Sequence, residues 1–297
     1  MSDQPLMIQL RPHQQQAVNA MWDNDRGQII VPTGGGKTIC MIDDAKTMMQ
    51  MGIQYGKTFV VVAPRILLAE QLCSEFLELI DTTHTHIMHV HSGETQHFST
   101  TKPDSIHMFA NTARTAGENV IIFTTYHSLH RVQEADIEVN TIYFDEAHNS
   151  VQRNFFPATE FFAGDADRKY FFTATPKHSL TVFKPGMNDP EVYGQVICNV
   201  PAPKLVEQGY ILPPKVVVKN LPTGDAKLTD CDNLLQTIDE QPLDKILIAA
   251  RSTKQIMRLV TQSNFCEEVE SRGYSWMHIT AKHGAIIDGV KVNRECF

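Results

Sequence analysis

Residues 31–38 read Val-Pro-Thr-Gly-Gly-Gly-Lys-Thr, and this stretch constrains the fold more than any other part of the chain. The largely apolar run 28–31 predicts a short buried strand, and 39–42 opens a helix. Glycines at a strand-to-helix junction let backbone N–H groups and the helix N-terminus face a phosphate. The alternative is a glycine-rich turn with a chance lysine. The junction favours a phosphate-binding loop, whose expected contact residues are Thr33, Gly34, Gly35, Gly36, Lys37 and Thr38.

Two side chains of this loop have expected roles toward a nucleoside triphosphate. Lys37 would reach the β- and γ-phosphates, and the Thr38 hydroxyl would hold a magnesium ion. The loop therefore predicts ATP and Mg²⁺ as cofactors. The general pattern has a glycine where this chain has Val31, and an apolar residue there is typical of helicase-like motors.

The composition describes a globular protein. The 297 residues are 42% hydrophobic and 20% charged, enough for two ordinary domains. No apolar run approaches the roughly 18–20 residues that span a bilayer, and the N-terminus has no secretion signal. The six cysteines form no Cys-x-x-Cys pair, which favours reduced thiols and a cytoplasmic or other nucleic-acid-containing compartment. The net charge of −8 argues against passive electrostatic coating of nucleic acid but leaves room for a local basic groove.

Short β-branched runs alternate with helical stretches over the first two thirds of the chain. This alternation predicts an α/β fold with a mostly parallel sheet flanked by helices. The expected strands are 28–31, 58–63, 87–90, 120–124, 141–145 and 170–173. Prolines cluster between about 185 and 222, which marks connecting segments. We therefore expect a first domain over residues 1–200 and a second, incomplete α/β unit over 201–297, with strands at 215–219, 245–250 and 274–279.

A second motif, Asp145-Glu146-Ala147-His148, follows the expected strand 141–145. In open parallel sheets ligands bind at the carboxyl ends of strands, where the loop at 31–38 also lies. Asp145 could therefore coordinate the magnesium and Glu146 could polarise the attacking water. The alternative for an acidic pair at a strand end is a helix N-cap. The phosphate-binding loop favours the catalytic interpretation, with Lys37, Asp145 and Glu146 as the catalytic group.

The order and spacing of Gly-Lys-Thr, Asp-Glu-Ala-His and Thr173-Ala174-Thr175 resemble those of superfamily 2 helicases of the DEAD/DEAH-box type. The resemblance implies a RecA-like P-loop NTPase domain followed by a partial second RecA-like domain. In this family the threonine hydroxyls link the nucleotide site to strand binding, and the resemblance implies that His148 couples the two domains. Leu10-Arg11-Pro12-His13-Gln14 resembles the adenine-reading segment, which implies base contacts by Arg11 and Gln14, although both could be surface residues of a helix.

Further segments resemble the family's nucleic-acid contacts. The resemblance implies strand contacts by Pro64, Arg65, Thr124 and Thr125, and 247–252 is similar to the opening motif of the second motor domain. The family's arginine-bearing segment, which reaches the γ-phosphate, has no match after Arg251. We therefore expect this chain to bind ATP with magnesium but to hydrolyse it slowly, since such an arginine contributes roughly 10³–10⁵ in rate in related systems.

Five histidines crowd the stretch from 84 to 97, namely His84, His86, His89, His91 and His97. A metal site is one interpretation, but it needs convergent side chains. Alternation along a strand would instead place successive pairs on opposite faces, so a partly exposed edge strand is favoured.

The leading hypothesis is thus an ATP-dependent helicase or translocase whose partner is nucleic acid, with DNA favoured over RNA and no membrane. One alternative is the motor subunit of a restriction or repair assembly. Another is a non-motor switch, in which nucleotide binding only controls docking to a partner.

Overall fold

The computed structural model describes residues 9–51, 56–181, 183–213, 215–216, 218, 230–241, 243–280 and 284–292. The chain divides into two compact units, Met1–Pro214 and Lys215–Phe297. None of the described helices is long and apolar enough to cross a membrane.

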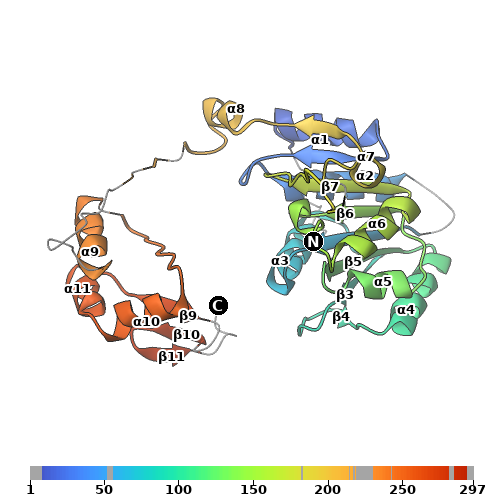
Figure 1. Ribbon diagram of the computed structural model, residues 1–297. Coiled ribbons are helices and arrows are strands. Elements are labelled where there is room, and N and C mark those ends of the chain that lie inside the picture. The colour runs from blue at the N-terminus through green and yellow to red at the C-terminus, as the bar shows by residue number, and fades with distance from the viewer. Residues whose placement is uncertain are drawn as a thin grey trace, which may run out of the picture. The chain divides into compact units, whose positions relative to one another are not determined.

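Among the described residues of the first unit, eight strands form one sheet in the order β4-β3-β5-β2-β6-β7-β1-β8 (Figure 1). Every neighbouring pair is parallel. The strands are β1 (Arg26–Ile30), β2 (Thr58–Ala63), β3 (Thr85–Val90), β4 (Phe98–Ser99), β5 (Asn119–Thr125), β6 (Thr141–Phe144), β7 (Arg168–Thr173) and β8 (Val196–Asn199). The α/β fold with a parallel sheet is thereby confirmed, and the six predicted strands are all present. The edge strands β4 and β8 were not predicted from the sequence.

Helices cover both faces of this sheet because its strands are apolar on both sides. Within β2, Phe59 and Val61 face one apolar cluster, whereas Val60 and Val62 face the other. The first cluster is covered by α1 (Pro12–Trp22), α2 (Lys37–Gln50), α3 (Ile66–Leu79) and α8 (Ala202–Glu207). The second is covered by α4 (Pro103–Thr115), α5 (Leu129–Glu134), α6 (Phe156–Asp165) and α7 (Pro190–Tyr193). The two-sided cover accounts for the continuous apolar runs in the sequence.

The first compact unit extends past residue 200, the boundary expected from the prolines. β8 pairs with β1 at the edge of the sheet, and Leu205 of α8 is fully buried in the first apolar cluster. The contacts of α8 therefore place it with the first unit, and the division between the units falls at 214/215.

A buried ionic network links α1, α2, β6 and β7 on the face of the sheet that carries the first apolar cluster. The carboxylate of Asp44, on α2, is fully buried and accepts two hydrogen bonds from the Arg168 guanidinium of β7, at 2.8 and 2.9 Å. The Tyr143 hydroxyl of β6 donates to the same carboxylate at 2.6 Å. Arg168 also donates to the carbonyl of Met21 at 3.1 Å. The bidentate geometry and the added hydrogen bonds offset the cost of burying these charges.

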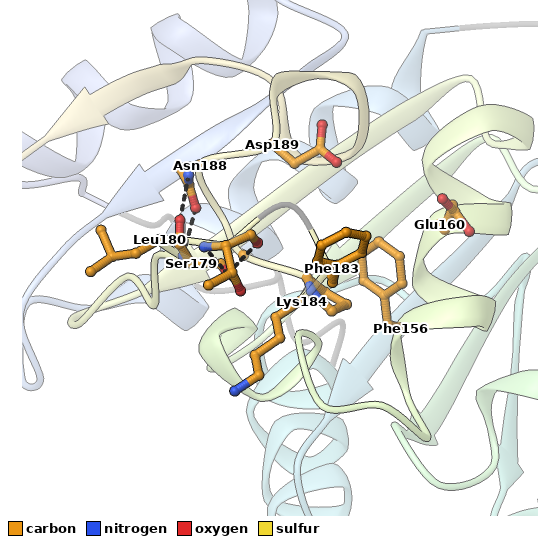
Figure 2. A pocket seen from close by; sticks show the side chains of 11 residues that line it. Phe156, Glu160, Ser179, Leu180, Phe183, Lys184, Asn188 and Asp189 are labelled. Atoms are coloured by element: carbon orange, nitrogen blue, oxygen red, sulfur yellow. Dashed lines mark hydrogen bonds between the residues drawn. The ribbon is translucent and has the colours of Figure 1, made fainter.

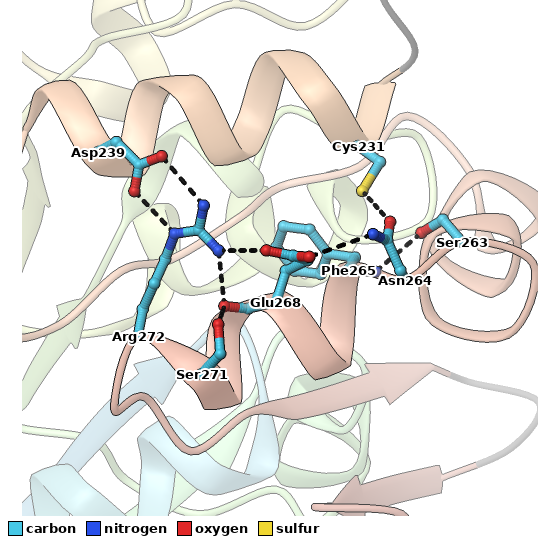
Figure 3. Close-up of polar contacts among 8 residues, drawn as sticks. All are labelled: Cys231, Asp239, Ser263, Asn264, Phe265, Glu268, Ser271 and Arg272. Atoms are coloured by element: carbon cyan, nitrogen blue, oxygen red, sulfur yellow. Dashed lines mark hydrogen bonds and ion pairs between the residues drawn. The ribbon is translucent and has the colours of Figure 1, made fainter.

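The second unit packs three helices beside a three-stranded antiparallel sheet. Its described elements are α9 (Asp230–Glu240), α10 (Thr253–Thr261), α11 (Phe265–Ser271), β9 (Met277–Thr280), β10 (Gly284–Ile287) and β11 (Val290–Val292). Arg272 clamps α9 to α11, since its guanidinium bonds Asp239 at 2.7 Å and Glu268 at 2.8 Å (Figure 3).

The three strands predicted for this unit have different outcomes. The strand predicted at 274–279 overlaps β9, and that at 215–219 lies partly outside the described residues. The strand predicted at 245–250 was wrong: the segment is not paired, and the Leu247 side chain is 96% exposed. A strand needs a hydrogen-bonding neighbour, and its apolar sequence alone does not supply one. That the second unit is a partial RecA-like domain remains a prediction.

We predict that Asp44→Ala lowers the free energy of unfolding by about 3–5 kcal/mol, because it leaves the Arg168 guanidinium buried without its partner. The combined variant Asp44→Leu/Arg168→Met should lose less than the single variant, since both charges are removed. Urea unfolding monitored by circular dichroism measures each value. Asp43→Ala, on the same helix but partly exposed, is the matched control. Equal losses for Asp44→Ala and Asp43→Ala would contradict the prediction.

Candidate functional site

The loop after β1 has the backbone of a phosphate-binding loop. Gly36 is the N-cap of α2 with φ 82°, and Gly34 has φ 79°, a left-handed conformation that glycine adopts readily. The N–H of Gly35 donates to the Pro32 carbonyl at 2.9 Å, which closes the turn. The first N–H groups of α2, which begins at Lys37, have no intrahelical acceptors. The loop therefore offers donors and a helix N-terminus to an anion, as the sequence predicts.

The acidic motif follows β6 at the same carboxyl edge of the sheet, one strand removed from β1. Lys37 Nζ lies 3.1 Å from Glu146 Oε1, so the two motifs meet in an ion pair. Glu146 has φ 46°, uncommon for a residue with a side chain, and this sharp turn directs it back toward the loop. The structure thus brings the predicted lysine and the predicted base together.

Two residues that the sequence did not single out hold the acidic motif by its backbone. The Tyr126 hydroxyl donates to the carbonyl of Asp145 at 2.8 Å, and the Asn149 amide donates to the carbonyl of Glu146 at 2.9 Å. Tyr126 is buried, and Asn149 belongs to the short 3₁₀ helix Ala147–Asn149. Asn149 directly follows the motif, which is a signal that could have been used. Tyr126 directly follows the predicted strand contacts Thr124 and Thr125, but no sequence signal linked it to the acidic motif.

Burial dominates the electrostatics of Asp145. Desolvation raises the pKa of Asp145 to about 6, and the neighbouring Glu146 carboxylate adds to the rise, whereas Lys37 opposes it. A desolvated carboxylate beside a second carboxylate is stabilised by a bound cation. The Asp145 carboxylate and the Thr38 hydroxyl are both hard oxygen donors, which is the kind that Mg²⁺ prefers. The residues present therefore fit the expected magnesium ion.

A hydrogen-bonded chain leads from the acidic motif to the end of β7. His148 Nδ1 lies 3.4 Å from Glu146 Oε2 and 3.0 Å from the Thr173 hydroxyl. The same hydroxyl accepts a hydrogen bond from the backbone N–H of Thr175 at 3.1 Å. The structure thus connects three of the residues for which the resemblance implies coupling, His148, Thr173 and Thr175.

The predicted base-contacting residues lie against the phosphate-binding loop. Gln14 is buried: its Oε1 accepts from the N–H of Arg11 at 2.8 Å, and its Nε2 donates to the Gly35 carbonyl at 3.3 Å. His13 Nε2 also lies 2.8 Å from that carbonyl. Arg11 is exposed. The amide of Gln14 is therefore engaged within the protein, and base contacts by Gln14 and Arg11 remain predictions.

The predicted nucleic-acid contacts separate into exposed and buried residues. Pro64 and Arg65 follow β2, and Arg65 is exposed as the N-cap of α3. Thr124 and Thr125, by contrast, are 0% and 3% exposed, and the Thr124 hydroxyl donates to the carbonyl of Val90 at 2.8 Å. The structure therefore places only the first pair at the surface, because β5 is an interior strand of the sheet.

The histidine-rich stretch builds part of the core. His89 and His91 are buried and hydrogen-bonded to each other at 3.0 Å, with His97 stacked on His89. Desolvation lowers the pKa of His89 to about 4, with smaller contributions from His91 and His97. Among the described residues, no group of three His, Cys, Asp or Glu side chains is arranged to hold a metal ion. The edge-strand prediction was wrong, because β3 pairs with both β5 and the two-residue β4, which forms the edge of the sheet.

A separate pocket of about 580 Å³ lies between α6 and the loop before α7, away from both motifs (Figure 2). Phe156 and Glu160 line it from α6, and Phe183 and Lys184 line it from the loop. None of the predicted site residues lines it.

Comparisons with known proteins agree with this arrangement. The family described as "Type III restriction enzyme, res subunit" matches residues 7–178, more than half of the chain. The structure of the ATP-dependent Type ISP restriction-modification enzyme LlaBIII bound to DNA superposes with a TM-score of 0.58 and 20% identity, covering 70% of this chain and 16% of that chain. A nuclease-deletion mutant of the Type ISP enzyme LlaGI, in complex with a DNA substrate mimic, superposes with a TM-score of 0.58 and 23% identity, covering 68% and 18%.

These structural likenesses establish the fold. The chain spans less than a fifth of the length of either enzyme. A search of the curated proteins gives no match.

We predict that Asp145→Asn stabilises the ligand-free protein at pH 8 by up to about 3 kcal/mol. The folded-state pKa of Asp145 is raised to about 6. Protonation of this carboxyl group therefore stabilises the folded protein fully below the unfolded-state pKa near 4, and this stabilisation is lost as the pH rises through 6. The gain of Asp145→Asn should therefore shrink between pH 7 and pH 4. Urea unfolding across this range measures it, with the exposed Asp165→Asn as control. A gain independent of pH would contradict the prediction.

Proposed function

Because the chain belongs to the family of type III restriction enzyme res subunits, we propose that it is an ATP-dependent motor, a helicase or translocase that acts on DNA. Its first unit would bind and hydrolyse ATP, and its coupling residues would transmit the nucleotide state to a bound strand. We further propose that it works as the motor of a restriction assembly, in a nucleic-acid-containing compartment such as the cytoplasm.

The observation that carries this proposal is the continuous set of contacts from the phosphate-binding loop to the end of β7. Lys37 pairs with Glu146, Glu146 lies next to His148, and His148 contacts Thr173. A change at the phosphate-binding loop therefore reaches the Thr173–Thr175 segment through direct contacts. A protein that only binds a nucleotide has no use for the contact between His148 and Thr173.

Hydrolysis follows from how these residues would rearrange around ATP. Lys37, now paired with Glu146, would turn to the β- and γ-phosphates, which frees the Glu146 carboxylate to accept a proton from the attacking water. Thr38 and Asp145 would hold Mg²⁺, which neutralises the charge of the phosphates when bound. Loss of the ion pair would also let Glu146 approach His148, so γ-phosphate binding would bias the coupling contacts.

The motor and the switch hypotheses differ in what they require of the site. A switch needs only nucleotide-dependent docking, whereas a motor needs turnover that depends on the strand. The base Glu146, placed 3.1 Å from the loop lysine, favours a site that hydrolyses ATP. The family favours DNA over RNA as the strand.

We predict that Glu146→Gln keeps the affinity for ATP and Mg²⁺ within a few fold but lowers the hydrolysis rate by at least about 100-fold, because the amide is not a base. Lys37→Ala should instead weaken ATP binding itself. Calorimetric titration and phosphate release measure the two effects, with the exposed Glu78→Gln as control. We expect slow turnover, so long single-turnover time courses are needed. Unchanged hydrolysis in Glu146→Gln would reject its role as the base.

We also predict that DNA stimulates ATP hydrolysis by the full-length protein more strongly than RNA of the same sequence at one fixed salt concentration, which must be held constant because strand affinity depends on it. Phosphate release against strand concentration provides the measurement. A strand-independent rate would favour the switch over the motor. Displacement of a labelled strand then separates unwinding from translocation alone.

A further inference from the structure

α8 ends in a turn whose backbone fixes the position of an aromatic ring. Gly209 follows the helix with φ 72°, and its N–H donates to the carbonyl of Val206 at 2.9 Å. The N–H of Tyr210 donates to the carbonyl of Leu205, also at 2.9 Å. This pair of bonds is the Schellman motif, in which glycine takes the left-handed position and the next residue packs on the helix. Tyr210 accordingly packs in the same apolar cluster as Leu205.

The residues on both sides of this turn pack directly on the phosphate-binding loop. A Cβ atom added at Gly35 would lie 3.2 Å from Leu205 Cδ1, and one added at Gly34 would lie 3.4 Å from Ile211 Cγ2. The end of α8 thus forms one wall beside the loop. Tyr210 stands in this wall between Leu205 and Ile211 and is partly exposed.

The ring of Tyr210 faces the segment expected to contact the base. Its centroid lies 5.3 Å from that of the His13 ring, and the Arg11 Cζ atom lies 4.9 Å from the Tyr210 centroid. His13 in turn bonds the Gly35 carbonyl, so the ring and the phosphate-binding loop share a neighbour. An aromatic face and a planar guanidinium are therefore held together at the side of the loop.

The Gln14 side chain is bonded within the protein, which bears on the residue that holds the base. Both ends of its amide bond the protein, and the side chain is buried. Arg11, by contrast, is exposed, and a cation–π contact at an exposed site is weak. Arg11 can therefore leave the ring face at little cost and stack on the other side of a flat ligand, as guanidinium groups do on aromatic rings.

We propose that Tyr210, with Arg11, forms the wall on which the base of the bound nucleotide stacks. The proposal rests on the proposed ATP site and adds to it a base-positioning residue from outside the motifs named above. Stacking on a ring face tolerates any base, so the preference for adenine over other purines is expected to be small.

The test compares a ligand that carries a base with one that has none. Adenylyl imidodiphosphate and inorganic tripolyphosphate, each with Mg²⁺, are titrated calorimetrically into the full chain. Tyr210→Ala should weaken binding of the nucleotide analogue roughly 5- to 100-fold and leave tripolyphosphate within about two-fold, since stacking contributes only to the former. Tyr210→Phe, which keeps the ring, should match the wild type for both ligands.

Tyr210→Leu covers the case in which Tyr210→Ala fails to fold, because leucine keeps the apolar contact with Leu205 but has no flat face. It should behave as Tyr210→Ala does. If Tyr210→Leu binds the nucleotide analogue as tightly as the wild type, or loses both ligands equally, the stacking role is overturned and Tyr210 only supports the loop. If the wild type binds neither ligand, the proposed ATP site itself fails, and the stacking role with it. Lys37→Ala is the control for the phosphate contacts, since it should weaken the binding of both ligands.

Discussion

The buried carboxylate of Asp44 connects the three elements that carry the residues of the candidate site. It lies on the helix that begins at Lys37, and it bonds Tyr143 on the strand that leads into the acidic motif and Arg168 on the strand that ends at Thr173. A charge held without solvent tolerates little displacement of its partners, since any gap leaves part of the desolvation cost uncompensated. This network thereby constrains the relative positions of the phosphate-binding loop, Glu146 and Thr173.

The candidate site has contacts that fit a protein without bound nucleotide. The lysine that would meet the phosphates is paired with the base that would activate water, and the metal-binding carboxylate has a raised pKa because of its burial. An anion and a cation that bind together would offset both the Lys37–Glu146 ion pair and the raised pKa of Asp145. The arrangement therefore supports the proposal of a site for ATP with magnesium.

Much of the first unit could be predicted from the sequence. Apolar runs such as 58–63 are buried on both faces of a parallel sheet, so they appear as continuous strands, and the glycines at 34–36 mark the loop that needs left-handed backbone. β8 escaped prediction because a four-residue edge strand depends on its neighbour more than on its own residues. The segment 245–250 shows the reverse: it has the residues of a strand and no partner to pair with. Thr124 was assigned to a surface role by motif position, whereas its place in β5 buries it.

The sequence by itself determined the fold class, and it predicted the residues of the nucleotide site, because a phosphate-binding loop and an acidic pair need particular residue types at fixed positions along strand-to-helix junctions. Only the tertiary structure decided how these residues are connected. The pairing of Lys37 with Glu146, the burial of Asp44 with Arg168 and the approach of Tyr210 to Arg11 join positions between 109 and 199 residues apart. Contacts over such separations are set by the packing of the sheet and its helices, and local sequence patterns carry no record of them.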